Sequence, residues 1–191
     1  MEKVELPSGL VVILNNAENF QDDVKILSSL FSARKYRVIF LNNLNQLENT
    51  EKYKKLILFF FGYGYGKYVF SDKNQETIMS YEDLHCFLSS EKFGFSQIAL
   101  LSEVYLKPRK LDTIRGCFTA ELENFSHIQL CLNEMQPISM LRKCLQLCDH
   151  DRISIALHDL SMVLTKETRQ YSKDEYHCLW TQIKTCTDFT F

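Results

Sequence analysis

The sequence contains few of the residues that are typical of linkers, with only three prolines and six glycines in 191 residues. That scarcity argues against long disordered segments, and one domain of this length can bury a sizeable core. The formal net charge is only −2, so no basic footprint indicates a nucleic-acid partner. No apolar run approaches the roughly 20 residues that a bilayer-crossing helix needs. The composition is ordinary for a soluble globular protein without nucleic-acid or membrane partners.

Signals for disulfides and for secretion are also sparse. The seven cysteines are an odd number, and most fall inside apolar helix or strand patterns. This placement fits reduced thiols that pack as small hydrophobic side chains. The charged start, residues 1–5, lacks the character of a secretory signal. We therefore expect a cytoplasmic protein without a disulfide framework.

Short apolar runs of strand length alternate with segments whose apolar residues recur at helical spacing. Strands are expected at 9–16, 36–41, 56–61, 97–101, 128–132 and 179–191, with a small hairpin from 68–70 and 77–79. Helices are expected at 20–33, 44–53, 80–89, 138–148 and 153–166. This alternation predicts an α/β sandwich around a mainly parallel sheet.

The ends of two apolar strands carry the most informative pattern. The run 56–61 leads into Gly62-Tyr63-Gly64-Tyr65-Gly66, and the run 98–101 leads into Ser102-Glu103-Val104-Tyr105 about forty residues later. Another local feature is Leu14-Asn15-Asn16 followed by Phe20. Together with the order of elements, these features resemble the caspase peptidase domain along nearly the whole chain. In that family the two strand ends carry a Ser-His-Gly turn and a Gln-Ala-Cys-Arg-Gly turn.

The resemblance implies a caspase-like three-layer sandwich around a mainly parallel sheet of about six strands. It implies one domain over 1–191, with a large-subunit-like half at 1–106 and a small-subunit-like half at 124–191. The connection 107–123 between them is short. We expect it to stay uncleaved.

The positions that match the family's catalytic pair are Phe61 and Val104. A benzyl ring and two methyl groups can neither move a proton nor attack a carbonyl, whereas thiol proteolysis needs both functions. The substrate-binding arginines of the family also lack counterparts, because no arginine lies between Asn16 and Asp23 and Tyr105 follows Val104. The resemblance therefore implies a pseudoenzyme without catalytic residues.

Three other groups of residues are candidates for a catalytic, metal-binding or phosphate-binding site. His85 is interpreted as a half-buried helix residue beside a core cysteine, Cys86, and not as part of a thiol–base pair. The set Cys144, Cys148 and His150 lacks the fourth ligand of a structural zinc site and fits core packing. The segment 62–66 lacks the features of a phosphate-binding loop and is expected to be a tight turn. No cofactor or metal is expected.

Two surfaces are candidates for protein partners. The tyrosines Tyr63, Tyr65 and Tyr105 are expected on surface loops, where tyrosine is a favoured interface anchor. The terminal strand alternates as an edge strand would, and the matching edge forms the two-fold contact in caspase dimers. Its candidate interface residues are Gln182, Ile183, Lys184, Thr185, Cys186, Thr187, Asp188 and Phe189. The alternative is a monomer whose edge is blunted by Lys184 and Asp188.

The leading hypothesis is an inactive caspase homologue that regulates an active caspase by heterodimerisation, as an activator or as an inhibitor. A caspase adaptor is a second kind of partner, and a homodimer is compatible with the same edge. The alternative is a scaffold that uses this fold for assembly without a caspase partner. A third hypothesis is an enzyme whose chemistry has moved to other residues.

Overall fold

The fold is seen in a computed structural model of the protein. The described residues are 8–17, 19–48, 50, 53–65, 69–71, 77–88, 90, 93–106, 125–132, 137–149, 155–173, 178–184 and 189–191.

Six strands form the body of the sheet, in the order β2-β1-β3-β6-β7-β8. The first five are parallel, and β8 runs antiparallel to β7 at one edge. The expected mainly parallel sheet of about six strands is thus confirmed. Their bounds are β1 Leu10–Asn15, β2 Arg37–Leu41, β3 Lys55–Tyr65, β6 Gln97–Leu106, β7 Phe125–Leu132 and β8 Cys178–Lys184.

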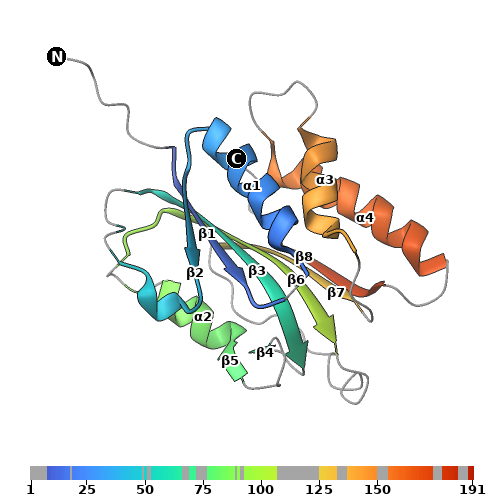
Figure 1. The fold of residues 1–191 in the computed structure, drawn as a ribbon, viewed down its shortest axis with the longest axis horizontal. Helices are drawn as coiled ribbons and strands as arrows, with labels where there is room; N and C mark the ends of the chain where they lie inside the picture. Colours follow the sequence, from blue (N-terminus) through green and yellow to red (C-terminus); the bar gives the residue numbers. More distant parts are fainter. Residues whose placement is uncertain are drawn as a thin grey trace.

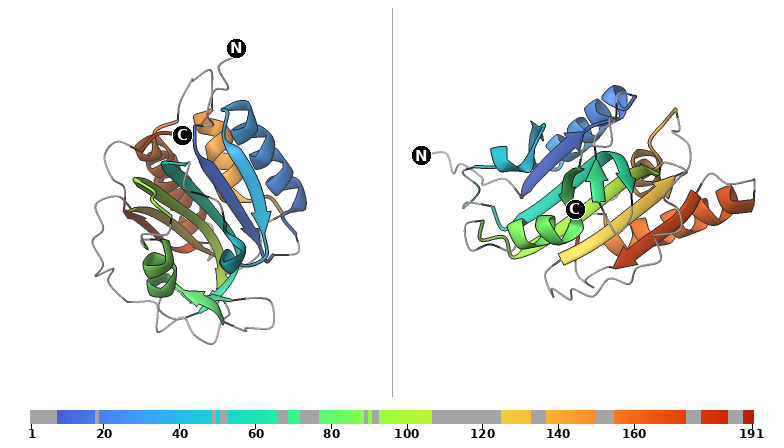
Figure 2. Two further views of the ribbon diagram at one scale, coloured as in Figure 1. Left: turned by 90° about the vertical axis from the view of Figure 1, so that its left-hand side faces the viewer. Right: turned by 90° about the horizontal axis from the view of Figure 1, so that it is seen from below.

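Helices cover both faces of the sheet (Figure 1). On one face lie α1 (Gln21–Ala33), α3 (Met140–Cys148) and α4 (Leu157–Lys173), and on the other lies α2 (Tyr81–Leu88). The expected hairpin is present as β4 (Val69–Ser71) and β5 (Thr77–Ser80), and it extends from the far end of β3. Figure 2 shows the three layers edge-on.

Each face of the sheet contributes to its own hydrophobic core, as expected for parallel strands that are covered on both sides. The core under α1, α3 and α4 includes Phe31, Phe59 and Leu141. The core on the α2 side includes Leu58 and Leu88. Because side chains alternate along a strand, neighbouring residues of β3 enter different cores.

Two central strands run further than the sequence predicted. Strand β3 continues through Tyr65 and β6 continues through Leu106, paired along their whole length. The prediction of a tight turn at 62–66 was therefore wrong for 62–65. The carboxyl ends of β3 and β6 are stabilised because they pair with each other. The sequence of either strand alone does not predict this pairing. A Cβ atom at Gly62 would lie 2.8 Å from the Phe60 ring, so glycine serves here for close packing.

Three other element boundaries differ from those expected. The helix expected at 44–53 is a single 3₁₀ turn, Leu44–Gln46, capped by Asn43. Helix α3 begins at Met140 because Ser139 caps it, which leaves Ile138 half exposed. Helix α4 starts at Leu157.

The terminal segment also departs from the expected strand 179–191. Strand β8 ends at Lys184, and the last described residues do not continue it. Thr190 bridges Ala156 instead, and the Phe191 ring contacts Phe31 of α1. Phe189 is buried in the core under α1, α3 and α4. It therefore stabilises the fold and leaves the set of interface candidates.

Candidate functional site at the carboxyl ends of the central strands

The carboxyl ends of β3 and β6 lie side by side, but their register separates the two residues that the sequence resemblance assigns to the catalytic positions. Phe61 pairs with Glu103, whereas Val104 pairs with Gly62. Phe61 enters the core under α1, α3 and α4, and Val104 enters the core on the α2 side. The structure therefore brings Phe61 and Val104 to adjacent strands but to opposite faces. The residue beside Phe61 on its own face is Glu103.

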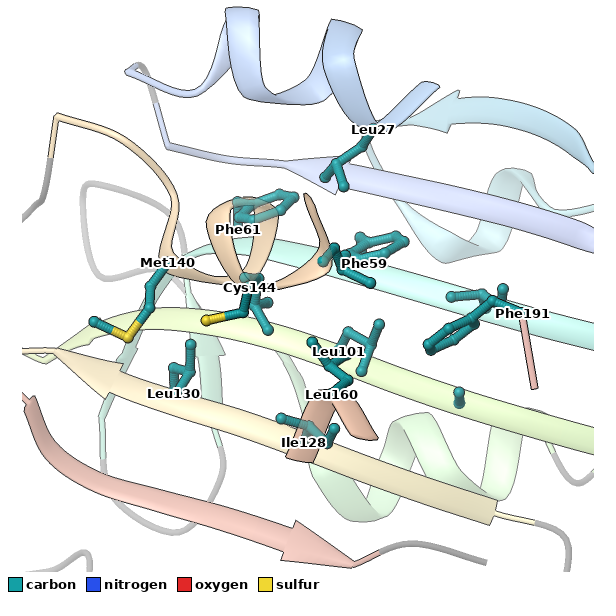
Figure 3. Close-up of a cluster of buried hydrophobic side chains, with 14 of the residues drawn as sticks. Leu27, Phe59, Phe61, Leu101, Ile128, Leu130, Met140, Cys144, Leu160 and Phe191 are labelled. Atoms are coloured by element: carbon teal, nitrogen blue, oxygen red, sulfur yellow. The ribbon is translucent and has the colours of Figure 1, made fainter. Parts of the chain in front are cut away.

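The Phe61 side chain is fully buried in a cluster of aromatic rings. Its ring centroid lies 5.5 Å from that of Phe20 and 6.1 Å from that of Phe59. Phe20 stacks in turn on Tyr105 at 5.8 Å. Figure 3 shows Phe61 pointing into the core toward Phe59 and α3. Rings at these separations stabilise one another, and the Phe61 ring itself brings no titratable group to this position.

Glu103 is a fully buried carboxyl group that receives hydrogen bonds from three residues. The Ser139 hydroxyl and the Leu141 amide donate to Oε2 at 2.8 and 3.1 Å, and the Tyr105 hydroxyl donates to Oε1 at 2.9 Å. Burial raises the pKa of this carboxyl group, and these donors oppose the rise. Glu103 thus joins the end of β6 to the first turn of α3, where free amides and the helix dipole favour a negative charge.

A second acidic residue joins α1 to the same turn of α3. Asp23 is 4% exposed, and its Oδ1 accepts a hydrogen bond of 2.8 Å from Arg142 Nε. Arg142 also donates to Gln146 on its own helix. No local sequence pattern indicates this ion pair, since its two residues lie 119 positions apart in the chain. Two buried carboxyl groups, on β6 and α1, therefore hold α3 at this edge.

The opposite face holds a serine–histidine contact that the sequence did not single out. Ser102 Oγ lies 3.4 Å from His127 Nε2, and both side chains are fully buried. Burial lowers the pKa of His127 to about 3, which keeps the ring neutral at physiological pH. A general base works best with a pKa near the working pH, so this pair is suited to packing and not to catalysis. The sequence sign that could have indicated a buried His127 is the alternation of Phe125, His127 and Gln129, which lie on one face of β7.

The described cysteine thiols are not arranged as activated nucleophiles. Cys144 and Cys148 are buried and face the core from α3. Burial, reinforced by the nearby Glu167, raises the pKa of Cys144 to about 12, whereas a reactive cysteine needs a lowered pKa. Cys86 is exposed, so its expected position in the core was wrong. The side chain of His85, and all of His150, lie outside the described residues.

The tyrosines proposed as loop anchors belong to strands. Tyr105 is buried in β6, and Tyr63 is half-buried in β3 with its ring 6.4 Å from that of Tyr105. Tyr65 ends β3, and its side chain lies outside the described residues. The expectation of three tyrosines on surface loops was therefore wrong for Tyr63 and Tyr105, because the two strands extend past the glycines.

The interface candidates Gln182–Lys184 lie in β8, which pairs only with β7 among the described strands. Residues 185–188 lie outside the described part of the chain.

Two kinds of feature are absent from the described residues. No group of three or more histidine, cysteine, aspartate or glutamate side chains within the described ranges is placed to hold a metal ion. No helix in that part of the chain combines the length and the apolar character needed to cross a membrane.

Comparison with known proteins identifies the architecture. The sequence matches no protein-family profile and no curated protein. The structure is similar to "structure of pro-sf-caspase-1", with a TM-score of 0.63 and 10% identity over 97% of each chain. It is also similar to caspase-1 from Spodoptera frugiperda, with a TM-score of 0.60 and 11% identity over 95% of this chain and 87% of that one. At this level of identity the similarity concerns the fold, and the protein has a caspase-like α/β fold.

Proposed function

We propose that this protein is a non-catalytic caspase-like module that binds and regulates an active caspase. The observation that carries the proposal is the composition of the carboxyl edge of β3 and β6. Phe61 and its aromatic neighbours fill one face there, and Glu103 beside it is committed to Ser139, Tyr105 and Leu141. A covalent mechanism requires an activated nucleophile with a base in reach. Neither residue supplies these groups.

The proposed binding surface is the edge of the sheet formed by β8. An edge strand presents backbone N–H and C=O groups that can pair with a strand of another chain. Within the described part of the sheet, β8 is the terminal strand on this side. A two-fold contact through such an edge would join this module to a protomer of the same architecture. A caspase-like partner could therefore associate by pairing one of its strands with β8.

The test combines the purified protein with active caspases from its source organism. We expect co-elution in size-exclusion chromatography and a change in the rate of peptide cleavage that saturates at one module per caspase protomer. No co-elution together with an unchanged rate contradicts the proposal. Affinity capture that recovers partners but no caspase would instead support a scaffold without a caspase partner.

A pair of proline variants addresses the β8 edge. Successive N–H groups of a strand point to opposite sides, so of Thr181 and Gln182 one donates toward β7 and the other toward the open edge. Proline removes one donor in each case. We expect one variant to lower the melting temperature clearly and the other to remain folded but lose caspase binding. Full binding by both folded variants would place the contact elsewhere.

A further inference from the structure

Strand β2 forms the outer edge of the described sheet on the side opposite β8 (Figure 1). It pairs with β1 over its five residues, without a break in register. Edge strands are usually protected from further pairing by proline, by a bulge or by charged side chains. Strand β2 contains no proline and no bulge, and its only charged residue is Arg37 at its start. This edge therefore lacks most of the usual protection.

The backbone groups on the open side of β2 follow from its pairing with β1. The Arg37 amide donates to the Gly9 carbonyl at 3.0 Å. In a parallel ladder the N–H and C=O groups of one residue point to the same side, and successive residues alternate. Arg37 and every second residue after it therefore face β1, whereas Val38 and Phe40 direct their N–H and C=O groups away from it. No strand of the described sheet pairs with them on that side.

The side chains of the same two residues lie on the α1 face of the sheet. Phe40 is in register with Ile13, whose side chain belongs to the core under α1, α3 and α4. Val38 packs against that core, but the Phe40 side chain is 56% exposed. A strand added at this edge would gain backbone hydrogen bonds and would bury the Phe40 ring at the same time.

A second copy of β2 fits this edge in the antiparallel orientation. A two-fold contact centred on Ile39 places Val38 opposite Phe40 of the second copy, and Phe40 opposite Val38 of the second copy. Both are then hydrogen-bonded pairs, in which the opposed residues exchange their N–H and C=O groups. Opposed side chains share one face, so each Phe40 ring would cover a valine. Such aromatic and β-branched pairs stabilise sheets.

The charges next to β2 also favour an antiparallel second copy. Arg37 is exposed at the amino end of the strand and forms no ion pair with a described acidic side chain. The segment 42–48 after the strand contains no lysine or arginine and ends at the exposed Glu48. The antiparallel contact places Arg37 opposite Leu41 of the second copy, next to this segment. A parallel contact would instead bring the two arginines together, which is unfavourable.

We propose that this protein forms a two-fold homodimer through antiparallel pairing of its β2 strands. The contact would join the two sheets into one continuous sheet. A contact between five-residue strands is smaller than a standard interface of about 1,600 Å². The dimer is therefore weak, with a Kd of roughly 10–1,000 µM. The contact does not involve β8 or a caspase partner, so it and the proposed function can fail independently.

The test is sedimentation velocity of the full chain between about 10 µM and 1 mM. We expect monomers to associate into dimers as the concentration rises. Phe40→Lys should raise the Kd at least about tenfold, because it removes both aromatic pairs and brings two cations into the contact. Phe40→Thr keeps a residue that favours strands, and it should weaken the dimer without lowering the melting temperature. Arg37→Glu should also weaken the dimer, because it faces the Glu48 end of the second copy with a like charge.

The matched control is Met162→Lys, which introduces the same charge at a residue of α4 whose side chain is 60% exposed. It should leave the Kd unchanged. Sedimentation as a monomer at every concentration overturns the proposal, and so does a dimer that persists unchanged in Phe40→Lys. An equal loss of association in Phe40→Lys and Met162→Lys also overturns it, because that result would indicate non-specific apolar contact.

Discussion

At the residue scale, buried ionisable groups are expected to make the stability of this protein depend on pH. His127 and Glu103 are both fully buried, one on each face of the sheet. Their pKa values move in opposite directions, downward for His127 and upward for Glu103. Burial disfavours the charged form of either group, so a base becomes harder to protonate and an acid harder to ionise. The two residues therefore stabilise the fold at opposite ends of the pH scale.

His127 should make the protein less stable in mild acid. Its pKa is about 3 in the folded state against 6.5 ordinarily. The contribution of the neutral His127 ring to the free energy of unfolding is thus complete above pH 6.5. It declines as pH falls toward 3, by up to about 1.4 kcal/mol per pH unit. His127→Phe keeps a ring without titration and should flatten the decline between pH 6.5 and 5 in urea unfolding. His158→Gln, at an exposed histidine, is the control. An unchanged slope in His127→Phe contradicts this assignment.

Glu103 should make the protein less stable as pH rises, which is the opposite direction to the effect of His127. Its folded-state pKa lies above the ordinary 4.5, so its contribution is complete below pH 4.5 and declines as pH rises through the folded-state pKa. Glu103→Gln cannot ionise, and the stability of the parent relative to this variant should fall as pH rises above 4.5. Urea unfolding of both proteins across pH 4 to 8 measures the difference. A difference independent of pH would mean that Glu103 has an ordinary pKa.

At the scale of elements, the paired ends of β3 and β6 determine what the candidate site contains. Gly62 sits where a larger residue would press on the Phe60 ring at 2.8 Å. Gly62→Ala should destabilise the protein by about 1–3 kcal/mol through overpacking. Phe60→Leu would relieve the contact, so the double variant should lose less than the sum of the single losses, measured by urea unfolding. Strict additivity would show that the Phe60 ring is not the source of the strain.

The elements also show how far sequence alone reaches. The bounds of β1 followed from an apolar run between Gly9 and Asn16, because local composition is enough for a strand buried on both faces. The extra length of β3 and β6 could not be predicted, since each end is stabilised by a partner about forty residues away.

The candidate site was only partly predictable for the same reason. Phe61 and Val104 lie on neighbouring strands, but both strands continue past them, and a one-residue offset in register puts the two residues on opposite faces. Glu103 would ordinarily be expected at the surface. Its burial depends on Ser139 and Leu141, 36 and 38 residues further along the chain.

On the scale of the whole molecule, packed side chains fill the carboxyl edge of the parallel sheet. Ligands of open α/β sheets generally bind at the carboxyl ends of the strands. Here that edge is occupied by the Phe61 cluster and by the Glu103 and Asp23 attachments to α3. A hollow of about 530 Å³ lies at the amino ends of β1, β2 and β3, and β8 forms one outer edge of the described sheet. This filled carboxyl edge is the feature on which the proposed non-catalytic function depends.

The most direct test of this account is a peptide-cleavage assay on the isolated protein at high concentration. Fluorogenic peptides with every amino acid at the position before the scissile bond would be used, with and without prior alkylation of the thiols. We predict rates equal to the buffer blank and unaffected by alkylation. Turnover that alkylation abolishes would contradict the account, because it would require a reactive cysteine and a base that the proposed function excludes.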